Sequence, residues 1–389
     1  MHKGFRFFLV IWSFSFVSNA FAFNDAFIQR KMQNFMHQYH VNGAAITVLN
    51  HGQVRTYVFG EAVPSRHIKV TEDTIFELGS ITKTFTGLIL AQNVLDGHSA
   101  LSDQIHPYLE KPHSKSIGNL TYLQLATHVS GLPFNARKLP YNASSSLVNK
   151  LKLHYYLRKS VPRFSPSSQM LYSNFAYGIL GRVLAKQDET NLTKLMRRKI
   201  LDPLNMKTAG LDISRANQRY LAQGFTAYGK PVRHMPSGLF GGAWAMRASA
   251  KDMGQYLRAA VGDPRTPPSL QRAMRYSQIP HYALTKEDMQ FGLGWVVTPF
   301  DKKDVFQRLI KRPEHYHFVP SAVRKLANPH FNPHALIGKT GATDGFRAYI
   351  AVIPEKKSGI VVMINRFTHS NGRLTSLANE ILLRESRGA

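Results

Sequence analysis

Three short motifs supply the residue types that open an amide bond through a serine ester. The only Ser-x-x-Lys in the chain begins at Ser80 and ends at Lys83, and the only Tyr-x-Asn begins at Tyr172 and ends at Asn174. Residues 339–341 form the only Lys-Thr-Gly. A hydroxyl nucleophile, two amines, a phenol and an amide are the parts that covalent catalysis by serine requires. The motifs therefore predict a serine hydrolase.

The first motif follows a turn-like segment, residues 77–79, and is predicted to begin a helix. Ser80 then lies in the first helical turn, where free backbone N–H groups and the positive helix end favour a developing alkoxide. Lys83 follows three residues later, so its amine lies on the same helix face as the Ser80 hydroxyl. This geometry favours proton transfer between them. A Ser-x-x-Lys alone also fits an ordinary helix start.

The second motif precedes an apolar helix expected to begin near Phe175. A tyrosine phenol has a pKa near 10, and two neighbouring ammonium groups would lower the pKa of Tyr172 and make it a proton shuttle at neutral pH. Asn174 is expected to donate to a substrate carbonyl. Taken alone, the motif also fits a tyrosine at an edge and a helix-capping asparagine.

The third motif lies in a glycine-punctuated segment, residues 339–346, that is typical of a strand with an accessible edge. Glycine at position 341 would let a flat ligand approach that edge closely. Lys339 and Thr340 would meet a substrate carboxylate. The N–H of Ala342 would form an oxyanion hole with the N–H of Ser80.

Together the motifs resemble those of the serine β-lactamases and penicillin-binding proteins, and Tyr-x-Asn in place of Ser-Asp-Asn is similar to the class C β-lactamases. The similarity extends over essentially the whole chain after residue 22. Further segments that resemble class C sequence, in the class C order, are residues 76–80, 125–128, 131–133, 171–174, 292–295 and 339–356.

The resemblance implies that Ser80 is acylated, that Lys83 and Tyr172 manage its proton, and that a water near Tyr172 removes the acyl group. It implies a substrate that carries an amide and a carboxylate, namely the β-lactam ring of penicillins and cephalosporins. The implied binding residues are Asn174, Lys339, Thr340, Gly341 and Ala342. No metal or organic cofactor is implied.

Three positions depart from the family pattern and bear on substrate range. Asn135 stands where the family commonly has glutamine, and Trp244 stands where a tyrosine often lines the side-chain pocket. Residues 367–372 replace the usual Asn-Tyr-Pro-Asn-Pro stretch, whereas Arg373 is retained. We expect Asn135, Trp244 and Arg373 to contact substrate, although Trp244 also fits an ordinary half-buried aromatic.

Residue patterns at the two chain ends predict an α+β fold, one antiparallel sheet flanked by helices with a mostly helical region inserted. The resemblance implies that this fold is of the β-lactamase/transpeptidase type. Strands are expected over residues 44–49, 54–59, 346–354 and 359–365, and helices over residues 24–37, 81–96, 121–128, 175–186, 192–200 and 374–383. We expect a single catalytic unit at 23–389, with its α/β part at about 23–79 and 285–389 and its helical part at about 80–284.

The first 22 residues have the pattern of a secretory signal peptide: a basic start, an apolar run from Phe7 to Val17 and Ala20-Phe21-Ala22 as a cleavage site. The apolar run is shorter than the roughly 20 residues that span a bilayer. We therefore expect a periplasmic protein without an anchor after cleavage, with a retained N-terminal anchor as the alternative. The chain has no cysteine, so disulfides play no part in its stability.

Basic residues are in large excess: 50 Lys and Arg against 23 Asp and Glu, a formal net charge of +27. This charge is spread along the chain and predicts a solvated basic surface with weak association to anionic envelope components. The sequence has none of the spacings of nucleic-acid-binding motifs, so no specific nucleic-acid partner is expected. We expect a monomer that acts on a small-molecule substrate.

Three other functions remain open at the level of sequence. A D,D-peptidase uses the same acylation residues, an esterase of this fold is a further alternative, and a penicillin-binding sensor would stay acylated at Ser80. A metal site formed by histidines 315, 317, 330 and 334 is disfavoured, because Pro329 and Pro333 argue against the helix that would align them.

Overall fold

The chain is described by a computed structural model over residues 23–135, 146–238, 240–300, 319–369 and 371–386. The expected signal peptide, residues 1–22, lies outside the described residues, and so do histidines 315 and 317. Among the described helices, none is both long and apolar enough to cross a membrane.

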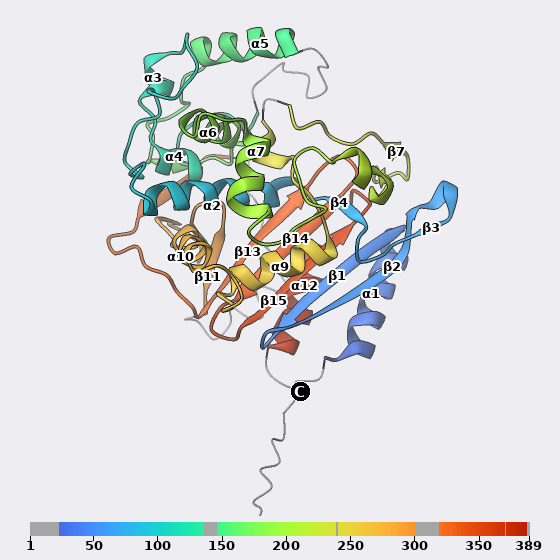
Figure 1. Cartoon of the computed structure of the whole chain (residues 1–389). Helices are drawn as coiled ribbons and strands as arrows, with labels where there is room; N and C mark the ends of the chain where they lie inside the picture. The colour runs from blue at the N-terminus through green and yellow to red at the C-terminus, as the bar shows by residue number, and fades with distance from the viewer. Residues whose placement is uncertain (1–22, 136–145, 239, 301–318, 370, 387–389) are drawn as a thin grey trace, which may run out of the picture.

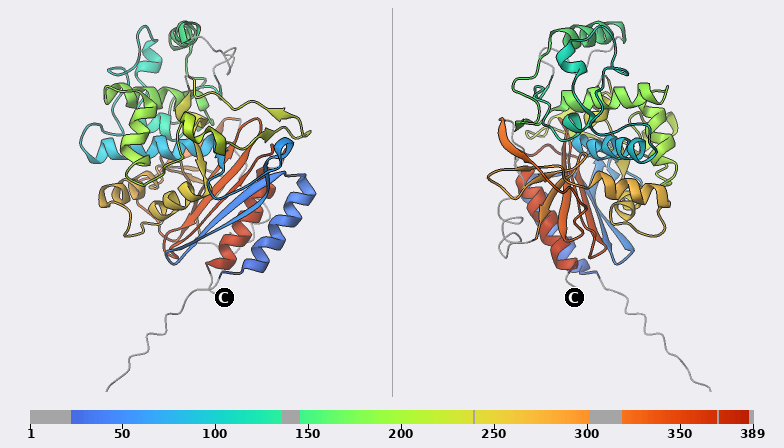
Figure 2. Two further views of the ribbon diagram at one scale, coloured as in Figure 1. Left: turned by 45° about the vertical axis from the view of Figure 1, so that its right-hand side comes forward. Right: turned by 90° about the vertical axis from the view of Figure 1, so that its left-hand side faces the viewer.

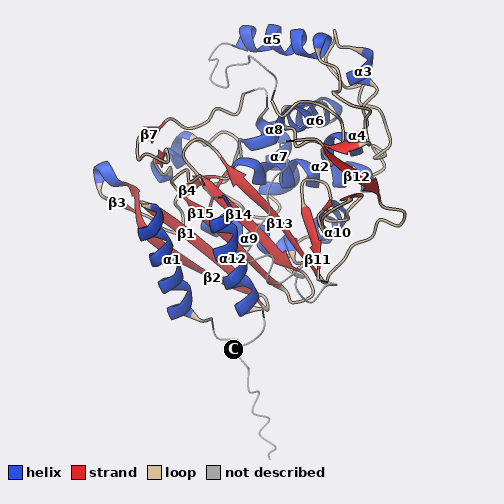
Figure 3. Cartoon of the chain, turned by 180° about the vertical axis from the view of Figure 1, so that it is seen from behind, coloured by secondary structure: helices blue, strands red, loops and turns tan. Residues whose placement is uncertain are grey.

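One antiparallel sheet of 11 strands dominates the structure (Figure 3). From one edge to the other its strands are β3 (Ile68–Lys69), β2 (Gln53–Val63), β1 (Gly43–Asn50), β15 (Ser358–Ile364), β14 (Arg347–Ile353), β13 (Ala335–Ala342), β11 (Val296–Pro299), β10 (Gln290–Phe291), β9 (Tyr282–Leu284), β12 (Ser321–Lys325) and β5 (Gln169–Met170). Two small two-stranded sheets accompany it: β4 (Ile75–Glu77) with β8 (Arg247–Ser249), and β6 (Gly224–Phe225) with β7 (Pro231–Val232).

The two ends of the chain meet in this sheet, as the sequence predicts. Strand β1 pairs with β2 through the expected hairpin and with β15 along its other edge, where Ala44 lies opposite Ile364. Strands β14 and β15 form the second expected hairpin. The predicted fold class is therefore confirmed.

Helices cover both faces of the sheet, so its central strands are apolar on both sides (Figures 1 and 2). Helices α1 (Asp25–Tyr39) and α12 (Asn371–Glu385) pack on one face, against a core that includes Ile46. Helix α9 (Ala250–Ala260) packs on the other, against a core that includes Ala45. Burial on both faces explains why β1, β14 and β15 are buried at every position.

The helical part of the structure lies above and to the left of the central strands β13, β14 and β15 in Figure 1. Its helices are α2 (Thr82–Leu95), α3 (Lys115–Gly118), α4 (Tyr122–Ala126), α5 (Ser146–Lys159), α6 (Asn174–Gln187), α7 (Leu192–Met196), α8 (Gly241–Trp244) and α10 (Pro268–Ser277), with the short helical segments η2 (Gly79–Ile81), η3 (Arg197–Leu201) and η4 (Arg215–Tyr220). A further short turn, η1 (Pro64–Arg66), connects β2 to β3.

Helix starts follow their sequence signals closely. Asn24 caps α1, Thr121 and Gln124 form a capping box at α4, and Ser173 caps α6. The cap at Ser173 fixes where α6 begins, and it therefore sets the position of Asn174 as the first residue of that helix. Helix α2 is apolar almost all round and is buried along most of its length, which holds its first turn rigidly.

Candidate active site

Ser80 lies in the short turn η2, directly before α2, and is partly exposed. The turn is held to the helix by the Thr82 hydroxyl, which donates to the Gly79 carbonyl at 2.6 Å. Lys83, in the first turn of α2, is fully buried. The predicted placement of the two side chains on one helix face is observed: Lys83 Nζ lies 3.1 Å from Ser80 Oγ.

The amine of Lys83 has two further partners, and both are carbonyl oxygens. Its Nζ lies 2.7 Å from Asn174 Oδ1 and 2.8 Å from the carbonyl oxygen of Ala243 in α8. Carbonyl oxygens only accept hydrogen bonds, so a neutral amine can give its two hydrogens to them and turn its lone pair to the Ser80 hydroxyl. The same three contacts serve a protonated amine as three donations.

Two effects lower the pKa of Lys83 well below its ordinary value of 10.5: burial first, and then the nearby positive charge of Lys339. Both favour the neutral amine. A neutral amine in contact with a serine hydroxyl is a base for that hydroxyl. Burial and the charge of Lys339 thus favour the proton-accepting form of Lys83, and its three contacts are compatible with that form.

The ring of Tyr172 lies close to both lysines. Its phenol accepts a hydrogen bond from Lys339 Nζ at 3.2 Å, and its ring centroid lies 4.9 Å from Lys83 Nζ. Burial raises the pKa of Tyr172 above its ordinary value, and a hydrogen bond with Ser80 opposes that rise only in part. The expectation that neighbouring ammonium groups lower this pKa is therefore wrong, because burial of the phenolate outweighs them. The phenol keeps its proton.

His128 is a neighbour of the site that lies outside the three motifs. Its ring lies 4.3 Å from the Tyr172 ring, centroid to centroid, and its Nδ1 accepts a hydrogen bond from the backbone N–H of Ser173 at 3.1 Å. Burial, together with the charges of Lys83 and Lys339, lowers its pKa far below 6.5. His128 is therefore a neutral ring that supports Tyr172. In the sequence, its role is indicated only by its place in segment 125–128, which resembles class C sequence.

Two glycines allow strand β13 to approach the Ser80 turn. A Cβ on Gly79 would lie 2.4 Å from the Ala342 nitrogen, and a Cβ on Gly341 would lie 1.9 Å from the Leu78 carbonyl oxygen. Both distances are far below any real contact of a Cβ. The approach brings the backbone of Ala342 beside the Ser80 turn, as an oxyanion hole formed by the Ser80 and Ala342 N–H groups would require.

The edge of β13 that carries the third motif faces this turn. Strand β11 pairs only with residues 335–338 of β13, whereas β14 pairs with β13 as far as Ala342. Lys339, Thr340 and Gly341 are buried, and Ala342 is partly exposed. In the described sheet, residues 339–342 are thus bonded to one neighbouring strand, and their other edge is turned to η2.

Asn174 joins the second motif to the position that departs from the family. Its Oδ1 accepts from Lys83, and its Nδ2 donates to Asn135 Oδ1 at 3.0 Å. The backbone of Phe134 accepts from the Asn174 N–H at 2.8 Å, which holds the two segments together. The structure therefore brings Asn135 into the site, and both asparagines are partly exposed.

Trp244 and Arg373 are placed differently. Trp244 ends α8, is 6% exposed and packs on Phe240 at a ring-centroid distance of 5.6 Å. Helix α8 also provides the Ala243 carbonyl that contacts Lys83, so Trp244 is the residue next to one that lines the site. Arg373 is exposed in the first turn of α12. Their contact with substrate stays a prediction.

A second loop locks α2 against the sheet. Gly294 has φ +88°, and a Cβ on it would lie 2.3 Å from the Lys83 carbonyl oxygen; a Cβ on Gly87 would lie 1.9 Å from the Leu293 carbonyl oxygen. Segment 292–295, which resembles class C sequence, thus packs closely against the first two turns of α2. These close backbone contacts fix the position of Lys83 relative to the sheet.

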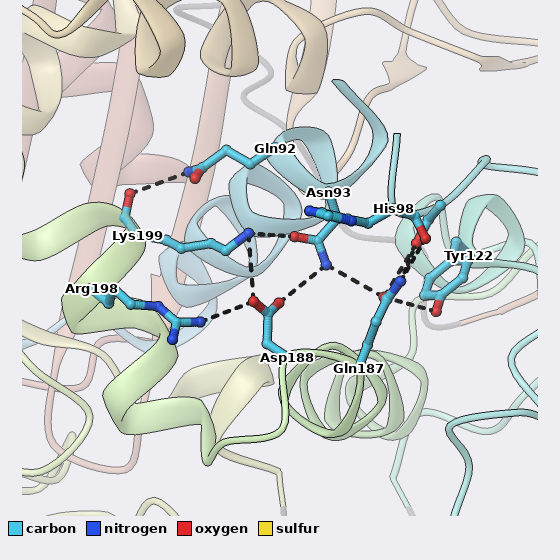
Figure 4. Close-up of polar contacts among 9 residues, drawn as sticks. Gln92, Asn93, His98, Tyr122, Gln187, Asp188, Arg198 and Lys199 are labelled. Atoms are coloured by element: carbon cyan, nitrogen blue, oxygen red, sulfur yellow. Dashed lines mark hydrogen bonds and ion pairs between the residues drawn. The ribbon is translucent and has the colours of Figure 1, made fainter. Parts of the chain in front are cut away.

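A polar network joins the far ends of the two helices that carry Lys83 and Asn174 (Figure 4). The buried Asn93, near the end of α2, accepts from Lys199 Nζ at 2.7 Å and donates to Asp188 Oδ2 at 3.3 Å. Gln187, the last residue of α6, accepts from Asn93 at 3.4 Å and from the Tyr122 hydroxyl at 3.2 Å. The network therefore fixes the register of α2 against α6.

Metal binding finds no support in the described part of the chain. No group of three or more potential metal ligands occurs there. His334 is exposed and contacts Glu355 Oε2 at 2.7 Å, and His330 contacts the Asn328 carbonyl. Histidines 315 and 317 lie outside the described residues.

Comparison with known proteins decides the family. A family model described as Beta-lactamase matches residues 28–382, more than nine tenths of the chain. The chain belongs to the beta-lactamase family. A beta-lactamase of Lysobacter lactamgenus is 30% identical over 92% of this chain and 91% of its own length, and one of Pseudomonas fluorescens is 28% identical over 91% and 97%.

Solved structures of beta-lactamase relatives agree on the fold. A beta-lactamase/D-alanine carboxypeptidase from Pseudomonas syringae superposes with a TM-score of 0.83 at 26% identity, covering 92% of this chain and 98% of that chain. The D-alanine carboxypeptidase AmpC from Burkholderia cenocepacia gives the same TM-score and coverage at 28% identity. The resemblance to class C serine β-lactamases is thereby confirmed, and the family supports a serine hydrolase that acts on β-lactams.

Proposed function

We propose that this protein is a serine β-lactamase of the class C type, which hydrolyses the β-lactam amide of penicillins and cephalosporins through an acyl-Ser80 intermediate. One observation carries the proposal: the buried amine of Lys83 contacts Ser80 Oγ at 3.1 Å while its other two partners are carbonyl oxygens. This arrangement leaves the serine hydroxyl as the group from which the amine takes a proton.

Acylation follows from that geometry. Lys83 accepts the proton of Ser80, and Ser80 Oγ forms a bond to the carbonyl carbon of the lactam, whose oxygen becomes negatively charged. The N–H groups of Ser80 and Ala342 stabilise that oxygen. When the C–N bond breaks, the lactam nitrogen takes a proton from the group formed by Lys83 and the Tyr172 phenol. We treat these two as one unit, because their titrations are coupled.

Substrate binding is proposed for the residues around this centre. Lys339 and Thr340 hold the substrate carboxylate, and the missing side chain of Gly341 lets the ring lie against β13. Asn174 and Asn135 bind the amide of the substrate side chain. Trp244 and Arg373 are proposed to limit that side chain from α8 and α12.

Deacylation requires a water that attacks the same carbonyl carbon. The Tyr172 phenol, held by Lys339 Nζ and packed on His128, is the group proposed to orient this water. Since burial keeps the phenol protonated, the proton of the water passes to the amine of Lys83, and Lys83 gives that proton to Ser80 Oγ as the ester bond breaks.

A D,D-peptidase is the second candidate, because the names of two structural relatives include D-alanine carboxypeptidase. The two activities share acylation and differ in the rate of deacylation. We further propose that residues 1–22 direct export to the periplasm and are removed, as expected for an enzyme of this family.

The test is a comparison of two substrates with the chain that begins at Phe23. Turnover of the chromogenic cephalosporin nitrocefin is expected to exceed that of a peptide ending in D-Ala-D-Ala, and both are expected to vanish in Ser80→Ala. Faster peptide turnover, together with a long-lived nitrocefin adduct, would assign a D,D-peptidase instead. If Ser80→Ala kept both activities, the proposal would be refuted.

A further inference from the structure

The positive charge of the chain is concentrated by the absence of carboxylates from one long stretch. Between Lys111 and Gln187 the sequence has eleven Lys and Arg residues and no Asp or Glu. The carboxylates that bound the stretch are paired: Glu110 with Arg182, and Asp188 with Arg198 at 2.9 Å. No side chain of this stretch can therefore neutralise a neighbouring cation.

Helix α5 lies in the middle of this stretch and forms the outer edge of the helical part (Figures 1 and 2). It has two apolar faces. Leu153 and Leu157 are buried against the protein. On the opposite face, Leu151 is 61% exposed and Tyr155 is 60% exposed. These two residues are four apart, so they form one outward stripe.

Cations flank the outward stripe. Arg158 and Lys159, in the last turn of α5, are exposed, and so is Arg163 just beyond it. Lys115 of α3 is exposed next to them, because the backbone N–H of Ser114 bonds to the Leu157 carbonyl at 2.8 Å. Among the described residues, none of these four cations is part of an ion pair.

The helix is firmly attached to the rest of the protein. Its end is tied to α3 by the Ser114 hydroxyl, which donates to the Ser160 carbonyl at 3.1 Å. The Tyr156 ring lies 6.5 Å from the ring of Phe175, the residue after Asn174. The outward stripe is therefore a fixed feature of the surface.

We propose that the outward stripe of α5, with its flanking cations, docks the protein on an anionic lipid bilayer. A leucine and a tyrosine surrounded by Lys and Arg is the composition of an interfacial helix: the apolar side chains enter the acyl boundary and the cations meet lipid phosphates. A soluble polyanion would neutralise the cations but leave Leu151 and Tyr155 in water. The lipid surface satisfies both features.

Docking through α5 also sets an orientation. In Figures 1 and 2 α5 lies at the end of the molecule opposite to the last turn of α12. A bilayer bound to α5 would therefore contact the helical part and leave the α1–α12 face of the sheet in water. The proposal is independent of the reaction at Ser80.

The experiment is sedimentation of the full mature chain with vesicles of phosphatidylglycerol and phosphatidylcholine in equal parts, and with phosphatidylcholine alone. Binding is expected only with phosphatidylglycerol, and it is expected to weaken in about 1 M salt, where the screening length is about 3 Å. Arg158→Gln with Lys159→Gln should weaken binding about fivefold for each charge. Leu151→Ser with Tyr155→Ser should weaken it without any change of charge.

The matched control is Arg215→Gln with Lys356→Gln, which removes two exposed cations outside the stretch and should leave binding within about twofold. An equal loss in this control would assign binding to net charge and overturn the proposal. So would unchanged binding of the Leu151 and Tyr155 variant, or binding to heparin without binding to vesicles. A single variant, Tyr155→Trp, provides a readout that does not depend on weakened binding: its fluorescence should shift to shorter wavelength on phosphatidylglycerol vesicles, and an unchanged spectrum would contradict insertion.

Discussion

Gly79 and Ala342 lie so close that a Cβ on Gly79 would come within 2.4 Å of the Ala342 nitrogen. The contact joins two segments that are far apart in the sequence and places the strand β13 backbone beside Ser80, the proposed nucleophile. An oxyanion hole shared between Ser80 and Ala342 depends on this approach.

Replacement of Gly79 by alanine should therefore impair catalysis. Its φ of +50° is unfavourable for alanine, and the added methyl group would push Ala342 away from Ser80. Loss of one oxyanion donor lowers kcat by about 10²–10³-fold, and we expect a loss of that size in nitrocefin turnover.

Gly97 provides the matched control for this prediction. It has φ +75°, and nothing lies within 4 Å of an added Cβ. Gly97→Ala should therefore cost about 1–2 kcal/mol of stability through backbone strain alone and leave kcat unchanged. Equal kcat values in the two variants would show that the close approach has no catalytic role.

Lys83→Arg should remove the base while it keeps a positive charge. A guanidinium does not lose its proton in proteins, so it cannot accept the proton of Ser80. We expect the acylation rate, measured by stopped-flow mixing with nitrocefin, to fall about 10²–10⁴-fold. Lys356→Arg, at an exposed position, is the control and should be neutral. An acylation rate within tenfold of the wild-type value would exclude Lys83 as the base.

The pH dependence of kcat/KM should report the pKa of Lys83. This pKa lies well below 10.5 because of burial and the charge of Lys339. Activity that needs the neutral amine is present above this pKa and is lost as the pH falls through it. Removal of the charge in Lys339→Met raises the pKa of Lys83, so the acidic limb should move to higher pH. A limb that stays in place, or moves to lower pH, would contradict this account.

Asn93→Ala should destabilise the protein, although Asn93 lies at the end of α2 far from Ser80. The variant leaves Lys199 Nζ without its 2.7 Å partner and removes the link to Gln187 and Asp188. We expect the free energy of unfolding, measured with urea, to fall by about 1–3 kcal/mol. Gln92, the half-buried neighbour that makes a single 3.3 Å bond to the Lys199 carbonyl, is the control, and Gln92→Ala should cost less than about 1 kcal/mol. Equal losses of unfolding free energy in the two variants would contradict a central role of Asn93 in this network.

Local sequence signals were sufficient for much of this structure. The strand hairpins at both chain ends, the caps at Asn24 and Thr121, and the start of α2 near Ser80 follow from patterns of a few residues. The Ser80–Lys83 contact follows from helical spacing alone. The meeting of β1 with β15 was predicted because strands at both ends enclose a helical middle.

Long-range packing decides what the sequence did not predict. The Ala243 carbonyl reaches Lys83 only because α8 packs on α2, and a backbone oxygen has no signature in the sequence. The pairing of β4 with β8 joins segments more than 150 residues apart in three-residue strands, which are too short to be detected. The pKa of Tyr172 was predicted in the wrong direction because charges can be read from sequence, whereas burial cannot.

The most direct test of the central claim is mass spectrometry of the mature chain quenched in acid within its first turnovers of a penicillin. We predict a mass increase equal to one intact penicillin, located by peptide mapping on the peptide that contains Ser80, and absent from Ser80→Ala. An adduct on another residue, or rapid penicillin hydrolysis that persists in Ser80→Ala, would contradict an acyl-Ser80 mechanism.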